Sequence, residues 1–222
     1  MRVVILGVTT GLGARLAESL LGRGMTPVGL VRSAEHTEAL KEAGVEPVVL
    51  DTHSAELRST VVRALTGADA VVLAAGTGTG PGSLGAATAT ASPAALLSGA
   101  AERVGVRRFV LVSALLPSAA DRAALGNDLP AYLREKANAE QALAERDLDW
   151  TVLRPGTLRD AAPTGRILLR SGADPGPEGE IGRADLATTI TYTLTAPRTV
   201  HRTLAVSTGS CEISTALAGI GT

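Results

Sequence analysis

A glycine turn near the start of the chain is the feature that most constrains its fold. The apolar run of residues 2–6 leads directly into a glycine-rich segment, where the pattern of an amphipathic helix begins. A strand, a tight turn and a helix in this order bring backbone N–H groups and the positive end of the helix together. This arrangement suits a pyrophosphate and predicts a dinucleotide site. The alternative is a turn that binds no ligand. The expected contact residues are Gly7, Thr9, Thr10, Gly11, Leu12 and Gly13.

Apolar and amphipathic segments alternate along the rest of the chain, as in βαβ units around a sheet that is buried on both faces. We expect strands at residues 2–6, 27–31, 47–50, 70–74, 108–113, 151–153 and 203–206. We expect helices at residues 12–21, 34–43, 54–65, 93–104, 130–146, 184–195 and 212–218. Right-handed crossovers then predict an α/β fold with a Rossmann-like, doubly wound parallel sheet of about seven strands in the order 3-2-1-4-5-6-7. Residues 1–222 are expected to form one domain.

Two glycine-rich segments match neither a strand nor a helix. Residues 76–85 combine Gly with Thr, and residues 155–182 combine Gly with Pro and Asp, so both are predicted to be loops. Each follows a strand and therefore lies at the carboxyl edge of the sheet, where open α/β folds bind ligands. We expect residues 114–131 and 155–182 to form a small substrate region. For residues 76–85 and 155–182 the alternative is that they are only surface loops.

The end of the second strand indicates which dinucleotide is preferred. A site for NAD carries a carboxylate there, which holds the ribose 2′-hydroxyl. This chain has Arg32 and Ser33 at that place, and the first carboxylate is Glu35. A guanidinium and a hydroxyl are donors suited to a 2′-phosphate, so the sequence predicts NADP(H) in preference to NAD(H). A solvated arginine at a strand end is the alternative.

The ends of the third and fourth strands offer contacts to the adenosine half of the same ligand. Asp51 follows the third strand and either accepts a hydrogen bond from the adenine amine or only caps the next helix. The small residues after the fourth strand would let a ribose approach the backbone. They are Ala74, Ala75 and Gly76.

Composition excludes several classes of partner. The formal net charge is −1 and the basic residues are spread along the chain, which gives no footprint for nucleic acid or an anionic membrane. We see no export signal and no apolar segment near the roughly 20 residues of a membrane span, so a cytoplasmic protein is expected. Cys211 is the one cysteine and the three histidines are scattered, so neither a disulfide nor a metal site is expected. The expected partner is a small-molecule substrate. The sequence leaves open whether the protein forms a homodimer.

Further motifs carry a resemblance to a known family. They are LVR at residues 30–32, RRFVLVS at 107–113, YLREK at 132–136, LDWTVLRPG at 148–156 and GRADLA at 182–187. With the glycine turn, they make the chain similar to the atypical short-chain dehydrogenase/reductase superfamily, specifically its small NAD(P)H-binding proteins grouped with biliverdin reductase B and NmrA-like proteins. One departure is Thr10, which stands where atypical members have the middle glycine of Gly-x-x-Gly-x-x-Gly. Cofactor binding is expected to survive this change.

Tyr132 and Lys136 are the candidate catalytic pair. Four residues apart on a helix, they share one face, and a nearby ammonium lowers the pKa of a tyrosine. Such a tyrosine can transfer a proton near neutral pH, whereas the alternative is a surface pair on a helix. The resemblance implies that Lys136 also holds the nicotinamide ribose, that Ser113 places a hydroxyl beside the substrate carbonyl, and that Pro155 lies over the nicotinamide. No asparagine occurs in residues 93–104, so the family's asparagine-dependent proton relay is not expected.

These features favour an enzyme, an NADPH-dependent oxidoreductase that reduces a small carbonyl, quinone or flavin-like substrate. In it, the cofactor would supply the hydride and the protein would supply position and a proton. One alternative is a non-catalytic NADP(H)-sensing regulator of the NmrA-like type. Another is an isomerase or epimerase of a biosynthetic pathway that uses the cofactor transiently.

Overall fold

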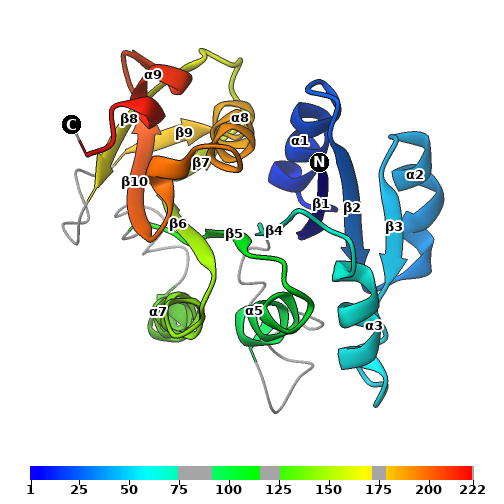
Figure 1. Ribbon diagram of the computed structural model, residues 1–222. Helices are drawn as coiled ribbons and strands as arrows, with labels where there is room; N and C mark the ends of the chain where they lie inside the picture. Colours follow the sequence, from blue (N-terminus) through cyan, green and yellow to red (C-terminus); the bar gives the residue numbers. More distant parts are fainter. Residues whose placement is uncertain (75–91, 116–125, 172–178, 222) are drawn as a thin grey trace.

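Within the residues that the structure describes, 1–74, 92–115, 126–171 and 179–221, a sheet of nine strands carries helices on both faces (Figure 1). The structure is a computed structural model. The strands are β1 (Arg2–Leu6), β2 (Thr26–Val31), β3 (Glu46–Val49), β4 (Ala70–Leu73), β5 (Arg108–Val112), β6 (Asp149–Pro155), β7 (Thr157–Arg159), β8 (Arg166–Ser171), β9 (Glu180–Gly182), β10 (Arg202–Thr208) and β11 (Cys211–Glu212). The α-helices are α1 (Gly11–Leu21), α2 (Thr37–Glu42), α3 (Leu57–Leu65), α5 (Pro93–Val104), α7 (Leu129–Ala144), α8 (Arg183–Thr193) and α9 (Ile213–Ala218). Short 3-10 turns are η1 (Ala34–His36), η2 (Gly126–Asp128) and η3 (Pro197–Thr199).

The central strands follow the predicted order. Across the sheet the order is β11-β8-β10-β6-β5-β4-β1-β2-β3, and every neighbouring pair from β10 to β3 is parallel. Counted along the chain, these parallel strands have the order 3-2-1-4-5-6-7. The Rossmann-like, doubly wound fold is therefore confirmed, with more strands in the sheet than expected.

The additional strands come mostly from a segment that was expected to be a loop. Residues 155–182 contain β7, β8 and β9, so the loop prediction was wrong for these stretches. β8 pairs antiparallel with β10, and β11 with β8, while β7 and β9 form a separate pair. Gly209 permits the close approach of β8, since a Cβ there would lie 2.3 Å from the Leu168 nitrogen. The other expected loop, residues 76–85, lies outside the described residues.

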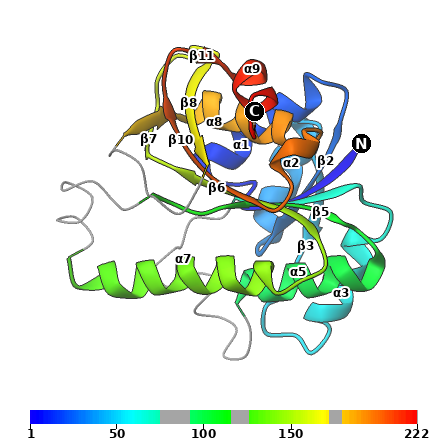
Figure 2. The ribbon, with the colours of Figure 1, turned by 60° about the vertical axis from the view of Figure 1, so that its left-hand side comes forward.

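Two layers of helices enclose the sheet, with α1 and α8 on one face and α3, α5 and α7 on the other (Figures 1 and 2). Strand β1 illustrates how the sequence produces this arrangement. Val3 and Ile5 belong to the core under α1 and α8, whereas Val4 and Leu6 belong to the core under α3 and α5. Because both faces are buried, the strand is a continuous apolar run rather than an alternating one.

The other predicted elements agree with the structure to within a few residues, apart from two helix starts. The helix expected at 34–43 begins as η1 and continues as α2. The helix expected at 54–65 begins only at Leu57, because Asp51 and Ser54 cap the turns before it. Asp51 Oδ1 accepts the His53 N–H at 2.9 Å. Ser54 Oγ accepts the Glu56 N–H at 3.0 Å.

Candidate functional site

The turn between β1 and α1 requires glycine at two positions. Gly7 has a φ of 102°, a conformation that strains any residue with a side chain. A Cβ on Gly13 would lie 2.0 Å from the Gly7 carbonyl oxygen. Thr10 closes the turn, because its hydroxyl donates to the Gly7 carbonyl at 2.8 Å and accepts the Gly13 N–H at 3.0 Å. The two glycines thus let β1 and α1 approach each other with no side chain between them.

The start of α1 fits the pyrophosphate that the sequence predicts. The first N–H groups of a helix have no intrahelical acceptor, and here they belong to Gly11 and Leu12. Thr9 and Gly11 are exposed, whereas the Leu12 side chain and Gly13 are buried. Leu12 can therefore meet a ligand only through its backbone N–H, whereas the N–H of Gly13 is already bonded to the Thr10 hydroxyl. The positive end of the helix would stabilise the negative charge of two phosphates.

The residues proposed to select the cofactor lie at the end of β2, next to the glycine turn. β2 pairs with β1, so Arg32 follows a strand that neighbours the start of the turn. The Arg32 side chain is exposed. Ser33 is half-buried, and its hydroxyl accepts the Glu35 N–H at 3.3 Å, which caps η1. Arg32 is therefore accessible to a ligand, while Ser33 already serves the local fold.

The predicted adenosine contacts lie along the same carboxyl edge. Asp51 is exposed just beyond β3 and takes part in the local turn described above. Ala74 is buried beyond β4, and its N–H donates to the Leu6 carbonyl at 2.9 Å. Ala75 and Gly76 lie outside the described residues.

The candidate catalytic side chains form a second group, beside the end of β5. Lys136, on α7, donates to the Val112 carbonyl at 3.4 Å. Its ammonium nitrogen lies 5.9 Å from the centre of the Tyr132 ring. Burial lowers the pKa of Lys136, and the neighbouring carboxylates of Glu135 and Glu140 oppose that shift. Tyr132 and Lys136 thus share one face of α7, as their spacing predicts.

Glu140 and Arg154 complete this group, and the sequence reasoning missed both as site residues. Ser113, buried at the end of β5, donates its hydroxyl to Glu140 Oε1 at 2.5 Å. Arg154, on β6, binds both oxygens of Glu140, with Nε donating at 3.0 Å and an Nη at 2.6 Å. The hydrogen bonds to Glu140 raise the pKa of Arg154. Glu140 lies four residues after Lys136, which is the same spacing that links Tyr132 to Lys136. This spacing therefore places Glu140 on the same face of α7 and could have indicated it as a site residue.

A cavity of about 520 Å³ borders this group between α7 and the sheet. Its walls include Leu115, Tyr132, Lys136, Glu140, Trp150 and Arg154. Pro155 is buried as the last residue of β6, so it continues the strand expected to end at residue 153. Its carbonyl accepts the Leu115 N–H at 2.9 Å.

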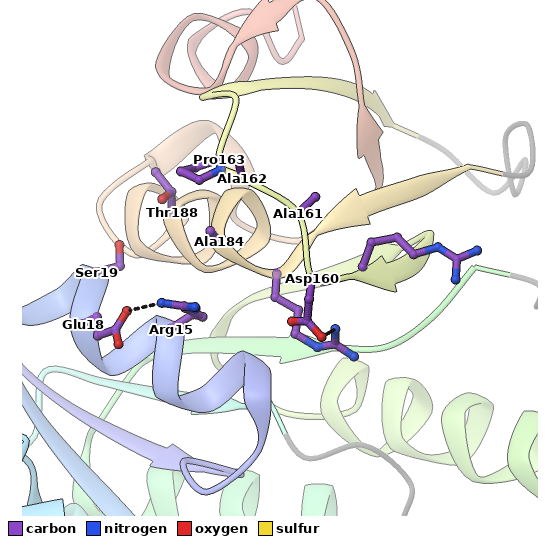
Figure 3. A pocket seen from close by; sticks show the side chains of 11 residues that line it. Arg15, Glu18, Ser19, Asp160, Ala161, Ala162, Pro163, Ala184 and Thr188 are labelled. Carbon is purple, nitrogen blue, oxygen red and sulfur yellow. Dashed lines mark hydrogen bonds and ion pairs between the residues drawn. The ribbon is translucent and has the colours of Figure 1, made fainter.

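A second cavity, of about 620 Å³, lies between α1, the start of α8 and residues 159–163 (Figure 3). Arg183 is a wall residue that lies beside the glycine turn. If Gly11 carried a Cβ, that atom would lie 3.4 Å from both Cδ and Nε of Arg183. Sequence reasoning placed Arg183 only in a family motif, because no local spacing links it to residues 7–13.

Within residues 1–74, 92–115, 126–171 and 179–221, His, Cys, Asp and Glu side chains nowhere gather in a group of three that could hold a metal ion. None of the helices described there combines the length and apolar character of a membrane span.

The parallel sheet and the glycine turn at the start of α1 together define a nucleotide-binding protein of the Rossmann class. The chain belongs to the NAD(P)H-binding family, whose model matches residues 7–197. A curated relative from Bacillus subtilis, described as the uncharacterized sugar epimerase YhfK, is 29% identical over 98% of this chain and 99% of its own.

Two solved structures extend this comparison. A putative NAD-dependent epimerase/dehydratase from Bacillus halodurans is 27% identical, covers 98% of both chains and has a TM-score of 0.78. ChuY, an anaerobillin reductase from Escherichia coli O157:H7, is 25% identical over 96% of this chain and 99% of its own, with a TM-score of 0.76. The protein is thus similar over almost its whole length to proteins described as epimerases and to one described as a reductase.

Proposed function

We propose that the protein is an NADPH-dependent oxidoreductase that reduces a small carbonyl, quinone or flavin-like substrate. The observation that carries this proposal is the arrangement of Tyr132, Lys136 and Ser113 at the end of β5, beside a cavity large enough for a small molecule. The resemblance to a reductase supports it. The carboxyl edge that holds this group also holds the glycine turn, so one bound dinucleotide could reach both.

The chain's own residues would position the reactants and move a proton. The glycine turn would hold the pyrophosphate, Lys136 would bind the nicotinamide ribose, and the bound cofactor would supply the hydride. While Ser113 donates to Glu140, its oxygen can only accept a hydrogen bond, so proton donation falls to Tyr132. The ammonium of Lys136 stabilises the phenolate that results when Tyr132 gives up its proton.

Replacing Tyr132 tests the reaction. Tyr132→Phe removes the proton donor and is expected to lower turnover roughly 100-fold while leaving NADPH affinity nearly unchanged. NADPH oxidation is measured against a panel of carbonyl, quinone and flavin acceptors. Tyr192→Phe is the matched control, because that ring lies on α8 beneath the Arg23 guanidinium, 4.1 Å from its centre. Equal turnover of Tyr132→Phe and the wild type would assign proton donation to another residue.

The preference for NADP(H) depends on Arg32 and has its own test. Arg32→Ala removes a donor that only a 2′-phosphate would use, so NADPH should bind about 10- to 100-fold more weakly and NADH about as before. Titration calorimetry with each cofactor measures the change. Arg63→Ala is the control, because Arg63 is exposed in the last turn of α3, which leads to the opposite edge of the sheet. An equal loss of affinity for both cofactors would contradict the proposed contact between Arg32 and the 2′-phosphate.

An epimerase is the second candidate, favoured by the descriptions of two similar proteins. An epimerase would convert its substrate with no net consumption of NADPH, because the hydride returns to the same molecule. A non-catalytic sensor would bind both cofactor forms but would not oxidise NADPH with any of the tested acceptors. Steady oxidation of NADPH by a true acceptor supports the reductase and counts against both the epimerase and the sensor.

A further inference from the structure

Arg183 is held beside the glycine turn by a rigid frame. It is the first residue of α8, a helix that packs along α1. Buried Asp185, in the same turn of α8, accepts the N–H groups of Thr164 and Gly165 at 3.0 and 2.8 Å. These bonds hold residues 164 and 165 against the start of α8. The position of Arg183 is therefore set by packed elements rather than by a free loop.

The ion pair of Arg183 is easily exchanged. One of its guanidinium nitrogens lies 2.8 Å from a carboxylate oxygen of Asp160. The Asp160 side chain is 85% exposed, whereas that of Arg183 is 28% exposed. A pair with an exposed carboxylate contributes little free energy, because water and salt screen it. Figure 3 shows Asp160 among the residues that line the cavity.

A pyrophosphate at the glycine turn would be a stronger partner for the same guanidinium. The Arg183 side chain packs within contact distance of Gly11, at the end of α1 that carries the partial positive charge. Phosphate oxygens accept from a guanidinium and from helix N–H groups at once, and arginine suits this recognition through its fork of donors. A Cβ at position 11 would lie at an ordinary van der Waals distance of 3.4 Å from Cδ and Nε of Arg183, so this side chain borders the first turn of α1.

We propose that Arg183 binds the pyrophosphate of the dinucleotide from the side opposite the α1 backbone, exchanging Asp160 for phosphate when the cofactor binds. Arg183 is thus a cofactor-binding residue, and Asp160 is a counter-ion that competes with the ligand. This inference rests on the proposed use of a nicotinamide dinucleotide. It is independent of the identity of the substrate and of the role of Tyr132.

The test measures affinity rather than activity. Titration calorimetry is run with NADPH, NADH and ADP-ribose, the last being a probe that has the pyrophosphate but neither the nicotinamide nor the 2′-phosphate. Arg183→Met should weaken the binding of all three ligands about 10- to 100-fold, by a similar factor for each. Arg32→Ala should weaken the binding of NADPH alone. Asp160→Asn should strengthen the binding of all three ligands several-fold, because it removes the competing anion.

Arg159→Met is the matched control. Arg159 lines the same cavity, but its guanidinium pairs with Glu180 at 2.6 Å. Its replacement should leave all three affinities unchanged, so an equal loss in Arg159→Met and Arg183→Met would reveal a general charge effect and overturn the inference. Wild-type affinity of Arg183→Met for ADP-ribose would overturn it as well.

Two further results separate this inference from the proposed function. A wild-type protein that binds neither NADPH nor NADH contradicts the proposed function itself. If Arg183→Met does not fold, Asp160→Asn decides alone, and unchanged or weaker binding in that variant refutes the exchange.

Discussion

At the scale of single residues, Gly13 makes the tightest approach in the nucleotide site. An added Cβ would meet the Gly7 carbonyl oxygen at 2.0 Å, so α1 and β1 must separate in Gly13→Ala. We expect a loss of about 1–3 kcal/mol in the free energy of unfolding, as for other overpacked positions. NADPH affinity should fall at least 10-fold, since the N–H groups of the first turn move. Urea denaturation and calorimetry measure the two effects.

Gly22→Ala provides the comparison for that prediction. Gly22 ends the same helix with a φ of −61°, and an added Cβ would come no closer than 3.4 Å to the Glu18 carbonyl oxygen. Its replacement should keep or slightly raise stability. A Gly13→Ala protein as stable as Gly22→Ala would show that the turn adapts without cost.

The candidate site could be predicted from the sequence only where its residues are linked by local spacing. The turn follows a strand directly, and Tyr132 and Lys136 are four residues apart, so both features are visible in one window. Arg183 reaches Gly11 only because α8 packs on α1. Arg154 reaches Glu140 only because β6 lies beneath α7. Contacts of this kind depend on the assembled fold.

At the scale of elements, Arg108 fastens the end of α8 to the sheet. Its guanidinium donates to the carbonyls of Thr193 and Asp149 at 2.6 Å each and to that of Leu194 at 3.3 Å. Burial lowers the pKa of Arg108 to about 10, so it still carries its charge at neutral pH. A cation near the last carbonyls of a helix satisfies acceptors that have no intrahelical donor, so Arg108 caps the C-terminus of α8.

Arg108→Met is therefore expected to destabilise the protein by roughly 2–4 kcal/mol, since three partly buried carbonyls lose their side-chain donor. The adjacent residue gives the control. Arg107 is exposed and pairs with Asp147 and Asp149 on the surface, so Arg107→Met should leave the unfolding midpoint nearly unchanged. Denaturant titration distinguishes the two variants. Equal midpoints would show that solvent replaces the Arg108 contacts.

The elements themselves were predictable to different degrees. α5 was expected with the bounds it has, because Pro93 fits its first turn and Gly105 ends it in the left-handed conformation. β8 was missed because a short strand between glycine-rich stretches is stabilised by its pairing with β10. That pairing joins residues more than 30 positions apart, such as Ser171 and Leu204. Local sequence carries no signal for such a pairing.

At the scale of the whole molecule, the order of the parallel strands could be predicted because handedness leaves few ways to connect βαβ units. The two layers of helices could be predicted because the strands are apolar on both faces. The extension of the sheet beyond β10 did not follow, since it adds antiparallel strands to an edge that the βαβ pattern leaves undefined. The prediction was thus complete for the seven parallel strands from β10 to β3 and incomplete at the edge beyond β10.

Trp150 has a consequence for the whole protein, because it is the one tryptophan in the sequence and it forms part of the wall of the cavity beside Tyr132 and Lys136. The centre of its ring lies 5.5 Å from that of the His201 ring. All indole fluorescence of the protein therefore originates at the edge of the candidate active site. Reduced nicotinamide absorbs in the range where indole emits, so the unmodified protein carries its own optical reporter for ligands entering that cavity.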